Sequence, residues 1–213
     1  MRRKEEAVQE ITDRREWLDG LEIGVLDGSE VGEVLGVLSR GMRDSPLHVA
    51  LFGEDQKPRE RRLRALIAAA FAVGDPSQVL AARGEDGAIV GVCGMAAPGG
   101  CQPGSGQGMR LFAPLPSGHQ HKAQRRHWHL GPLAVDAHLQ GMGVGTRLMQ
   151  VACARFDAAR GDAYLQTDGP ENVRFCARFG FEVVGVEEVL GLTTYFMLRR
   201  AEGRNAFALS SIG

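Results

Sequence analysis

The sequence predicts a mixed α/β (α+β) fold, with helices on the faces of one central sheet. In the second half of the chain, segments with strand patterns alternate with segments of helical spacing, an order typical of such sheets. The hydrophobic fraction is 44%, which is enough to fill a core. We therefore expect a single domain over 21–200, an N-terminal extension over 1–20 that contains a helix, and a C-terminal tail over 201–213.

In the first half, turn and capping residues delimit the elements. Asp27-Gly28 ends an alternating strand, and Ser29 is placed to cap the helix that follows. Pro46 interrupts the helical stripe, and 53–58 is expected to be a loop. A glycine-containing turn then separates two strands, as in a hairpin. The expected elements are a strand at 21–26, helices at 29–42 and 58–71, and strands at 78–82 and 88–95.

The second half begins with an irregular connection over 98–126, rich in glycine and proline. A long connection of this kind in a compact domain is usually functional or disordered. Beyond it the strand and helix patterns are clear, and Gly161 and Gly180 each follow a helix, where glycine is favoured. The expected elements are strands at 128–135 and 163–167, helices at 144–160 and 171–179, and closing strands at 181–186 and 193–198.

Composition and charge exclude several classes of protein. The 29 glycines among 213 residues do not recur every third residue, as they would in collagen. The formal net charge of −1 creates no cationic field for nucleic acid or acidic membranes, and no apolar run approaches the ~18 residues of a membrane span. The four cysteines form no CxxC pair, which favours reduced thiols. We expect a cytoplasmic protein without nucleic-acid or membrane partners, and leave a homodimer open.

The glycines at 141, 143 and 145 lie between a buried strand and a helix. Alternate glycines let a backbone approach a ligand closely, and the free amides of a helix start bind anions such as a pyrophosphate. A plain tight turn is the alternative interpretation. A P-loop would need a Lys where Thr146 stands, and a dinucleotide fingerprint would need a glycine where Leu148 stands, so both of those phosphate sites are excluded.

The spacing Gln140-x-x-Gly143-x-Gly145 resembles the acyl-CoA loop of the GNAT superfamily of N-acetyltransferases. Residues 133–136 look like the family's fourth strand, and 172–181 look like its Asn-containing helix and the Phe-Gly-Phe strand start that follows. The match covers roughly 128–199. Within the superfamily, 127–135 and 166–181 look closest to puromycin N-acetyltransferase-like bacterial enzymes.

The resemblance implies a mixed sheet of about seven strands, splayed between the fourth and fifth, with about four flanking helices. It implies acetyl-CoA as co-substrate, with the pyrophosphate on the loop and the pantetheine arm beside the fourth strand. A small-molecule amine then attacks the thioester directly, and no metal takes part. The implied contacts to acetyl-CoA are Leu133, Ala134, Val135, Gln140, Gly141, Met142, Gly143, Val144, Gly145, Thr146 and Asn172, the last of which is also a good helix cap.

The proton donor departs from the family pattern. Cys176 stands where the family usually has a Tyr that protonates the leaving thiolate. Three interpretations of the proton transfer are open: Cys176 donates the proton to the thiolate, Tyr195 or water donates it instead, or the reaction needs no general acid. Cys176 can equally be a small residue of the hydrophobic core without a catalytic role. If the acid has been lost, the alternative function is a non-catalytic acyl-CoA-binding module.

The candidate bases are His127 and His129, which alternate on one face of a strand and can pass protons near pH 7. The alternative interpretation is that both histidines have only a structural role at the end of the strand. Together with His119 and His121 they fit no common zinc spacing, so we expect no metal site.

Overall fold

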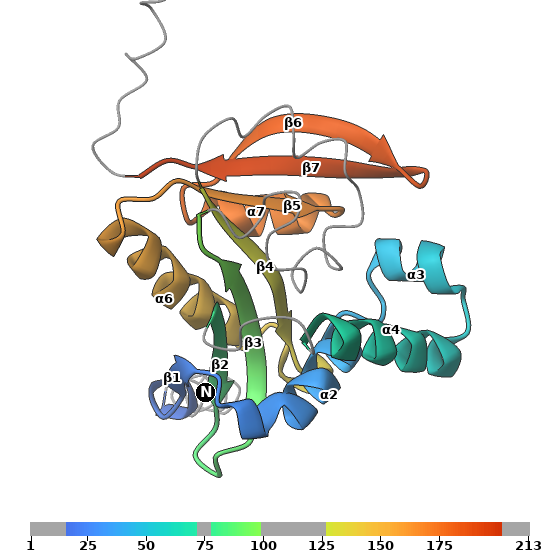
Figure 1. Ribbon diagram of the computed structural model, residues 1–213, viewed down its shortest axis with the longest axis horizontal. Coiled ribbons are helices and arrows are strands. Elements are labelled where there is room, and N and C mark those ends of the chain that lie inside the picture. Colours follow the sequence, from blue (N-terminus) through green and yellow to red (C-terminus); the bar gives the residue numbers. More distant parts are fainter. Residues whose placement is uncertain (1–15, 72–77, 99–126, 202–213) are drawn as a thin grey trace, which may run out of the picture.

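The computed structural model describes residues 16–71, 78–98 and 127–201. Its seven-stranded sheet has the order β1-β2-β3-β4-β5-β7-β6, and β4–β5 is the parallel pair among antiparallel ones (Figure 1). Most of the predicted extension over 1–20, the connection over 98–126 and the tail over 201–213 lie outside the described residues. The strands are β1 (Glu22–Val25), β2 (Val79–Arg83), β3 (Ile89–Ala96), β4 (Trp128–Val135), β5 (Ala163–Thr167), β6 (Glu182–Val189) and β7 (Leu192–Arg199).

Helices cover both faces of the sheet, so the predicted α/β layering is confirmed. The segments are α2 (Val31–Gly41), α3 (Pro46–Phe52), α4 (Gln56–Phe71), α6 (Val144–Ala158) and α7 (Pro170–Ala177), with short 3-10 turns η1 (Gly28–Glu30) and η4 (Ala137–Leu139). In the part of the chain that is described, no helix is both long and apolar enough to cross a membrane.

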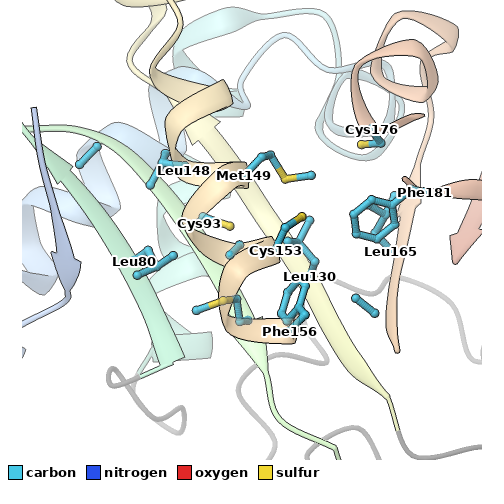
Figure 2. Packing of buried hydrophobic residues seen from close by; sticks show 14 of the residues in the cluster. Leu80, Cys93, Leu130, Leu148, Met149, Cys153, Phe156, Leu165, Cys176 and Phe181 are labelled. Atoms are coloured by element: carbon cyan, nitrogen blue, oxygen red, sulfur yellow. The ribbon is translucent and has the colours of Figure 1, made fainter. Parts of the chain in front are cut away.

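Each face of the sheet has its own hydrophobic core. On one face α6 and α7 pack with side chains such as Phe156, Leu165 and Phe181, which Figure 2 shows gathered between helix and strands. On the other face α2 and α4 contribute Leu38 and Leu63, both fully buried. The apolar residues of the predicted helices and strands therefore form two separate cores, one on each face of the sheet.

The sheet opens between its two central strands. β4 pairs with β5 at Trp128↔Ala163 and His129↔Tyr164, and no later residue of β4 has a β5 partner. Further along, Leu133, Ala134 and Val135 pair with β3 on their other side. The separation of β4 from β5 is the splay implied by the resemblance.

Two helix starts differ from the sequence interpretation. Asp27, rather than Ser29, caps the chain before α2, because its carboxylate accepts from the Ser29 amide while Glu30 reaches back to the Asp27 amide. Pro46 does not end helical structure but begins α3, with Ser45 as its cap. The predicted interruption is confirmed, because α2 ends at Gly41, but the sequence interpretation missed α3, since proline is well suited to the first turn of a helix.

Candidate functional site

The open edge of β4 is the first component of the site. Beyond His129, β4 has no β5 partner, so in the described residues the backbone groups of 133–135 that point toward β5 bond to no neighbouring strand. One of the groups at this end, the Val135 carbonyl, accepts a bond from the Gln140 side-chain amide. Ala134 packs toward α2, whereas Leu133 and Val135 pack toward α6. An extended chain that enters this gap can therefore pair with β4 as a strand would.

The glycine loop lies at the end of β4 and leads into α6. Gly141 has φ +79 and Gly143 has φ +108, both in the left-handed region that favours glycine. Gly143 is the N-cap of α6, and no side chain caps this helix. Its first internal bond runs from the Arg147 amide to the Gly143 carbonyl. The amides of Val144, Gly145 and Thr146 come before this first bond and therefore have no carbonyl partner within α6. They are the donors that the start of a helix offers to an anion.

Gly145 connects the loop to the gap between the strands. A Cβ at this position would lie 3.7 Å from the Phe175 ring on α7 and 3.7 Å from a methyl group of Val135 on β4. The α6 start, α7 and the end of β4 therefore converge on this residue. A ligand on the loop amides is adjacent to the open β4 edge.

Two long-range contacts hold the end of β4. The Arg40 guanidinium on α2 donates to both carboxylate oxygens of Asp136, and this bonding lowers the pKa of Asp136. The Gln140 amide donates to the carbonyls of Gly41 (3.2 Å) and Val135 (3.1 Å). Gln140 thus fastens the loop to α2 and β4, a role that the sequence did not indicate.

The N-terminal segment reaches the loop from the other side. Residues 16–19 form a helical turn, and a Cβ at Gly143 would meet Leu18 Cδ1 at 3.0 Å. Trp17 and Leu18 pack against the core under α6. The loop is therefore held between this turn and the end of β4.

His127 and His129 lie on the face of the sheet opposite α6, beside Tyr164 of the neighbouring strand β5. Their ring centroids are 5.5 and 6.2 Å from that of Tyr164, and all three residues are buried. Tyr164 stacks on Phe196 of β7 with centroids 6.3 Å apart. Burial raises the pKa of Tyr164, and the nearby carboxylate of Glu187 adds to the rise.

The sequence interpretation missed Tyr164 and Glu187, because only the strand registers place Tyr164 beside the histidines and Glu187 on the same face as Tyr164. Glu182, which begins β6, is exposed.

Cys176 lies on α7 in the core shared with α6. It is 7% exposed and lies among Phe181, Leu165 and Cys153 (Figure 2). Burial, with a smaller contribution from Cys153, raises the pKa of its thiol to about 11. It lies on the opposite face of the sheet from the two histidines.

Asn172 does not cap its helix, and Tyr195 does not face the two histidines. α7 begins at Pro170 with Gly169 as its cap, so Asn172 is an exposed residue of the first turn and not the cap. Tyr195 pairs with Thr167 and Val186, and so points away from Tyr164. In the described segments, three or more metal-binding side chains do not gather anywhere; His119 and His121 lie outside these segments.

Comparisons with known proteins agree with this geometry. A family model described as the acetyltransferase (GNAT) family matches residues 42–181. No curated protein matches the chain by sequence.

Solved structures share the fold. A histone acetyltransferase HPA2 and related acetyltransferase from Corynebacterium glutamicum is similar at 19% identity, over 87% of this chain and 99% of that chain, with a TM-score of 0.70. A GNAT family acetyltransferase from Brucella melitensis in complex with acetyl-CoA has 20% identity over 87% and 90% (TM-score 0.53). Arylalkylamine N-acetyltransferase 2 from Aedes aegypti has 13% identity over 84% and 98% (TM-score 0.59).

Proposed function

The chain belongs to the acetyltransferase (GNAT) family, and on that premise we propose that it transfers an acetyl group from acetyl-CoA to the amine of a small molecule. The observation that carries the proposal is the separation of β4 from β5 directly beside the glycine loop. This arrangement joins an anion site to an unpaired strand edge, which are the two surfaces that a pyrophosphate with a long amide-containing arm requires.

In this proposal the pyrophosphate lies on the amides of residues 141–146, and the pantetheine arm pairs with Leu133, Ala134 and Val135. Gln140 holds the loop, and Asn172 on the first turn of α7 contacts the arm. The thioester supplies the acetyl group when the co-substrate is bound. Holding it against the amine in one ternary complex supplies much of the acceleration, because the reaction no longer depends on a chance encounter.

Two proton transfers accompany the reaction. The ammonium of the acceptor loses a proton, and His127 and His129 are the bases proposed to take it, directly or through water. The departing CoA thiolate gains a proton, for which Cys176 is one candidate donor. A thiol with a pKa of about 11 is a weaker acid than an ordinary thiol of about 8.5. A solvent donor therefore competes with Cys176 for this step.

The acceptor is proposed to be a small amine. The likeness of 127–135 and 166–181 to puromycin N-acetyltransferase-like enzymes supports this, and a structural neighbour is an arylalkylamine N-acetyltransferase. A cytoplasmic location belongs to the same proposal, since three cysteines are free and buried.

The test is thiol release from acetyl-CoA across a panel of primary and secondary amines, with mass spectrometry of the acceptor. We expect acetylated amine and free CoA in equal amounts. Tight binding of acetyl-CoA by calorimetry without turnover of any amine would instead identify a non-catalytic acyl-CoA-binding module.

A further inference from the structure

The face of the sheet that carries the two histidines continues across β5 and β7 to the edge strand β6. Residues paired across two strands point to the same face. Gln166 pairs with Phe196, and two residues along β7, Thr194 pairs with Glu187. Because side chains alternate along a strand, Glu187 lies on the same face as Phe196 and the Tyr164 ring stacked on it. The next residue, Glu188, points to the opposite face.

Glu187 is a carboxylate in a partly apolar setting. Its side chain is partly buried, Thr194 beside it is 8% exposed, and Phe196 and Tyr164 are buried. Aromatic surface lowers the local dielectric and so strengthens the attraction of the carboxylate for a cation. A carboxylate has about four acceptor positions, so Glu187 can receive an ammonium in addition to contacts within the protein.

The distance from the reaction centre decides what this carboxylate can bind. β6 is two strands from β5 and three from β4, which corresponds to about 10 Å and about 14 Å at ordinary strand spacing, with the gap between these two limits. Glu187 also lies past Thr167↔Tyr195, the last pair of β5 with β7, and therefore at the end of the sheet where β4 and β5 have separated. A carboxylate so placed is too far from the thioester to contact the reacting nitrogen, but it can contact the other end of the acceptor.

We propose that the acceptor is an amine with a second cationic group at its far end, and that Glu187 binds this second cation. The inference rests on the proposed transfer to a small amine and adds the chemical class of the acceptor. The amine nitrogen reaches the open part of the β4–β5 gap, beyond the His129↔Tyr164 pair, while the distal ammonium or guanidinium pairs with Glu187.

The test compares cadaverine with n-pentylamine, which has the same carbon chain and lacks the distal charge. In the wild type, cadaverine is expected to have a KM lower by about tenfold or more, the usual effect of a hydrogen bond to a charged group. Glu187→Gln should remove this preference, with the KM for acetyl-CoA unchanged. The matched control is Glu188→Gln, which removes the same charge from the adjacent residue on the other face and should keep the preference.

A second variant distinguishes loss of the cation site from misfolding of the protein. Glu187→Lys should bind cadaverine poorly and favour 6-aminohexanoate, whose far end is an anion, and an unchanged KM for acetyl-CoA would report an intact fold. Turnover of both amines with equal KM in the wild type, or equal effects of the 187 and 188 variants, would overturn the inference and leave the proposed function standing. Absence of turnover with every amine would overturn both.

Discussion

At the scale of single residues, two of the three loop glycines are required by their backbone conformation. Gly141 and Gly143 have positive φ, and other residues adopt that conformation only with strain. Gly145 lies within α6, where a Cβ would make ordinary contacts at 3.7 Å. Alanine is therefore compatible with position 145 but not with position 143, where Leu18 also crowds the Cβ. The loop thus combines two positions that need glycine, 141 and 143, with a third, 145, that has room for a small side chain.

Gly141 offers a test of the pyrophosphate site, because no atom of the described residues lies within 4 Å of its Cβ position. Gly141→Asp and Gly141→Asn should carry the same backbone strain and differ only in charge. We expect the Asp variant to bind CoA at least about tenfold more weakly than the Asn variant, because like charges about 4 Å apart repel strongly at a protein surface. Calorimetry with CoA at low and high salt measures this, and salt should narrow the difference. Equal affinities would place the pyrophosphate elsewhere.

Cys176 can be assigned to catalysis or to packing by one substitution. Cys176→Ala removes the thiol and leaves a small void, so the free energy of unfolding should fall by about 1 kcal/mol. If the thiol only packs, kcat should stay within about threefold of the wild type, whereas loss of a general acid costs about a hundredfold or more. The measurements are urea unfolding and steady-state kinetics. Cys153→Ala, in the same core, is the matched control for packing alone.

At the scale of elements, most strands and helices could be predicted from the sequence, because hydrophobic alternation and helical spacing are local. The two errors at helix starts were also local. Pro46 after Ser45 is a cap followed by a first-turn proline, and Asp27 three residues before Glu30 is a capping box, so both signals were present. They were missed because proline was interpreted as a breaker and the nearest serine as the cap.

The parts of the site that escaped prediction depend on pairing between distant segments. Glu187 and Tyr164 lie on one face only because of the β5–β7 and β7–β6 registers, and a shift of one residue would reverse either side chain. The Asp168 carboxylate accepts from the Leu47 amide at 3.0 Å across 121 positions, which ties α3 to the end of β5. The loop glycines, in contrast, formed a local pattern that was visible in the sequence.

The bond between α2 and β4 predicts a pH dependence. Arg40 lowers the pKa of Asp136, so this pair stabilises the fold at neutral pH and the contribution is lost as the pH falls through the folded-state pKa. Asp136→Asn should therefore lower the free energy of unfolding by about 1 kcal/mol near pH 7, since Arg40 is 44% exposed and partly screened. The difference from wild type should shrink below about pH 4.

Urea unfolding across this pH range gives the measurement for the Arg40–Asp136 pair. Asp19→Asn, which removes a charge from an exposed position, is the control and should show little effect. A difference between wild type and Asp136→Asn that stays constant down to low pH would mean that Asp136 stabilises the fold by packing instead.

At the scale of the whole molecule, the sheet consists of two antiparallel halves joined weakly. β1 to β4 form one half and β5, β7 and β6 the other, and two parallel pairs connect them. The amide of Trp128 adds one bond to the Asp162 carbonyl at 2.8 Å, at the same closed end. At the open end, α3 reaches the β5 side through Leu47 and Asp168. A ligand between β4 and β5 would complete the missing contacts between the halves.

Acetyl-CoA should therefore stabilise the folded protein, and the stabilisation should be largest around the gap between β4 and β5. At about 100 times its Kd, it should raise the free energy of unfolding by about 2.7 kcal/mol, because it binds only the folded chain. Hydrogen exchange should slow most at 133–135 and 144–146, where the ligand covers or bonds the amides, and least in β1, on the far edge of the sheet. Gly141→Asp at the same ligand concentration is the control. If it binds at least about tenfold more weakly, it should lose about half or more of the stabilisation, and the slowing of exchange should fall with it. Equal slowing in β1 and at the β4 edge would contradict binding between the halves, because a ligand in the gap leaves the outer strand unchanged.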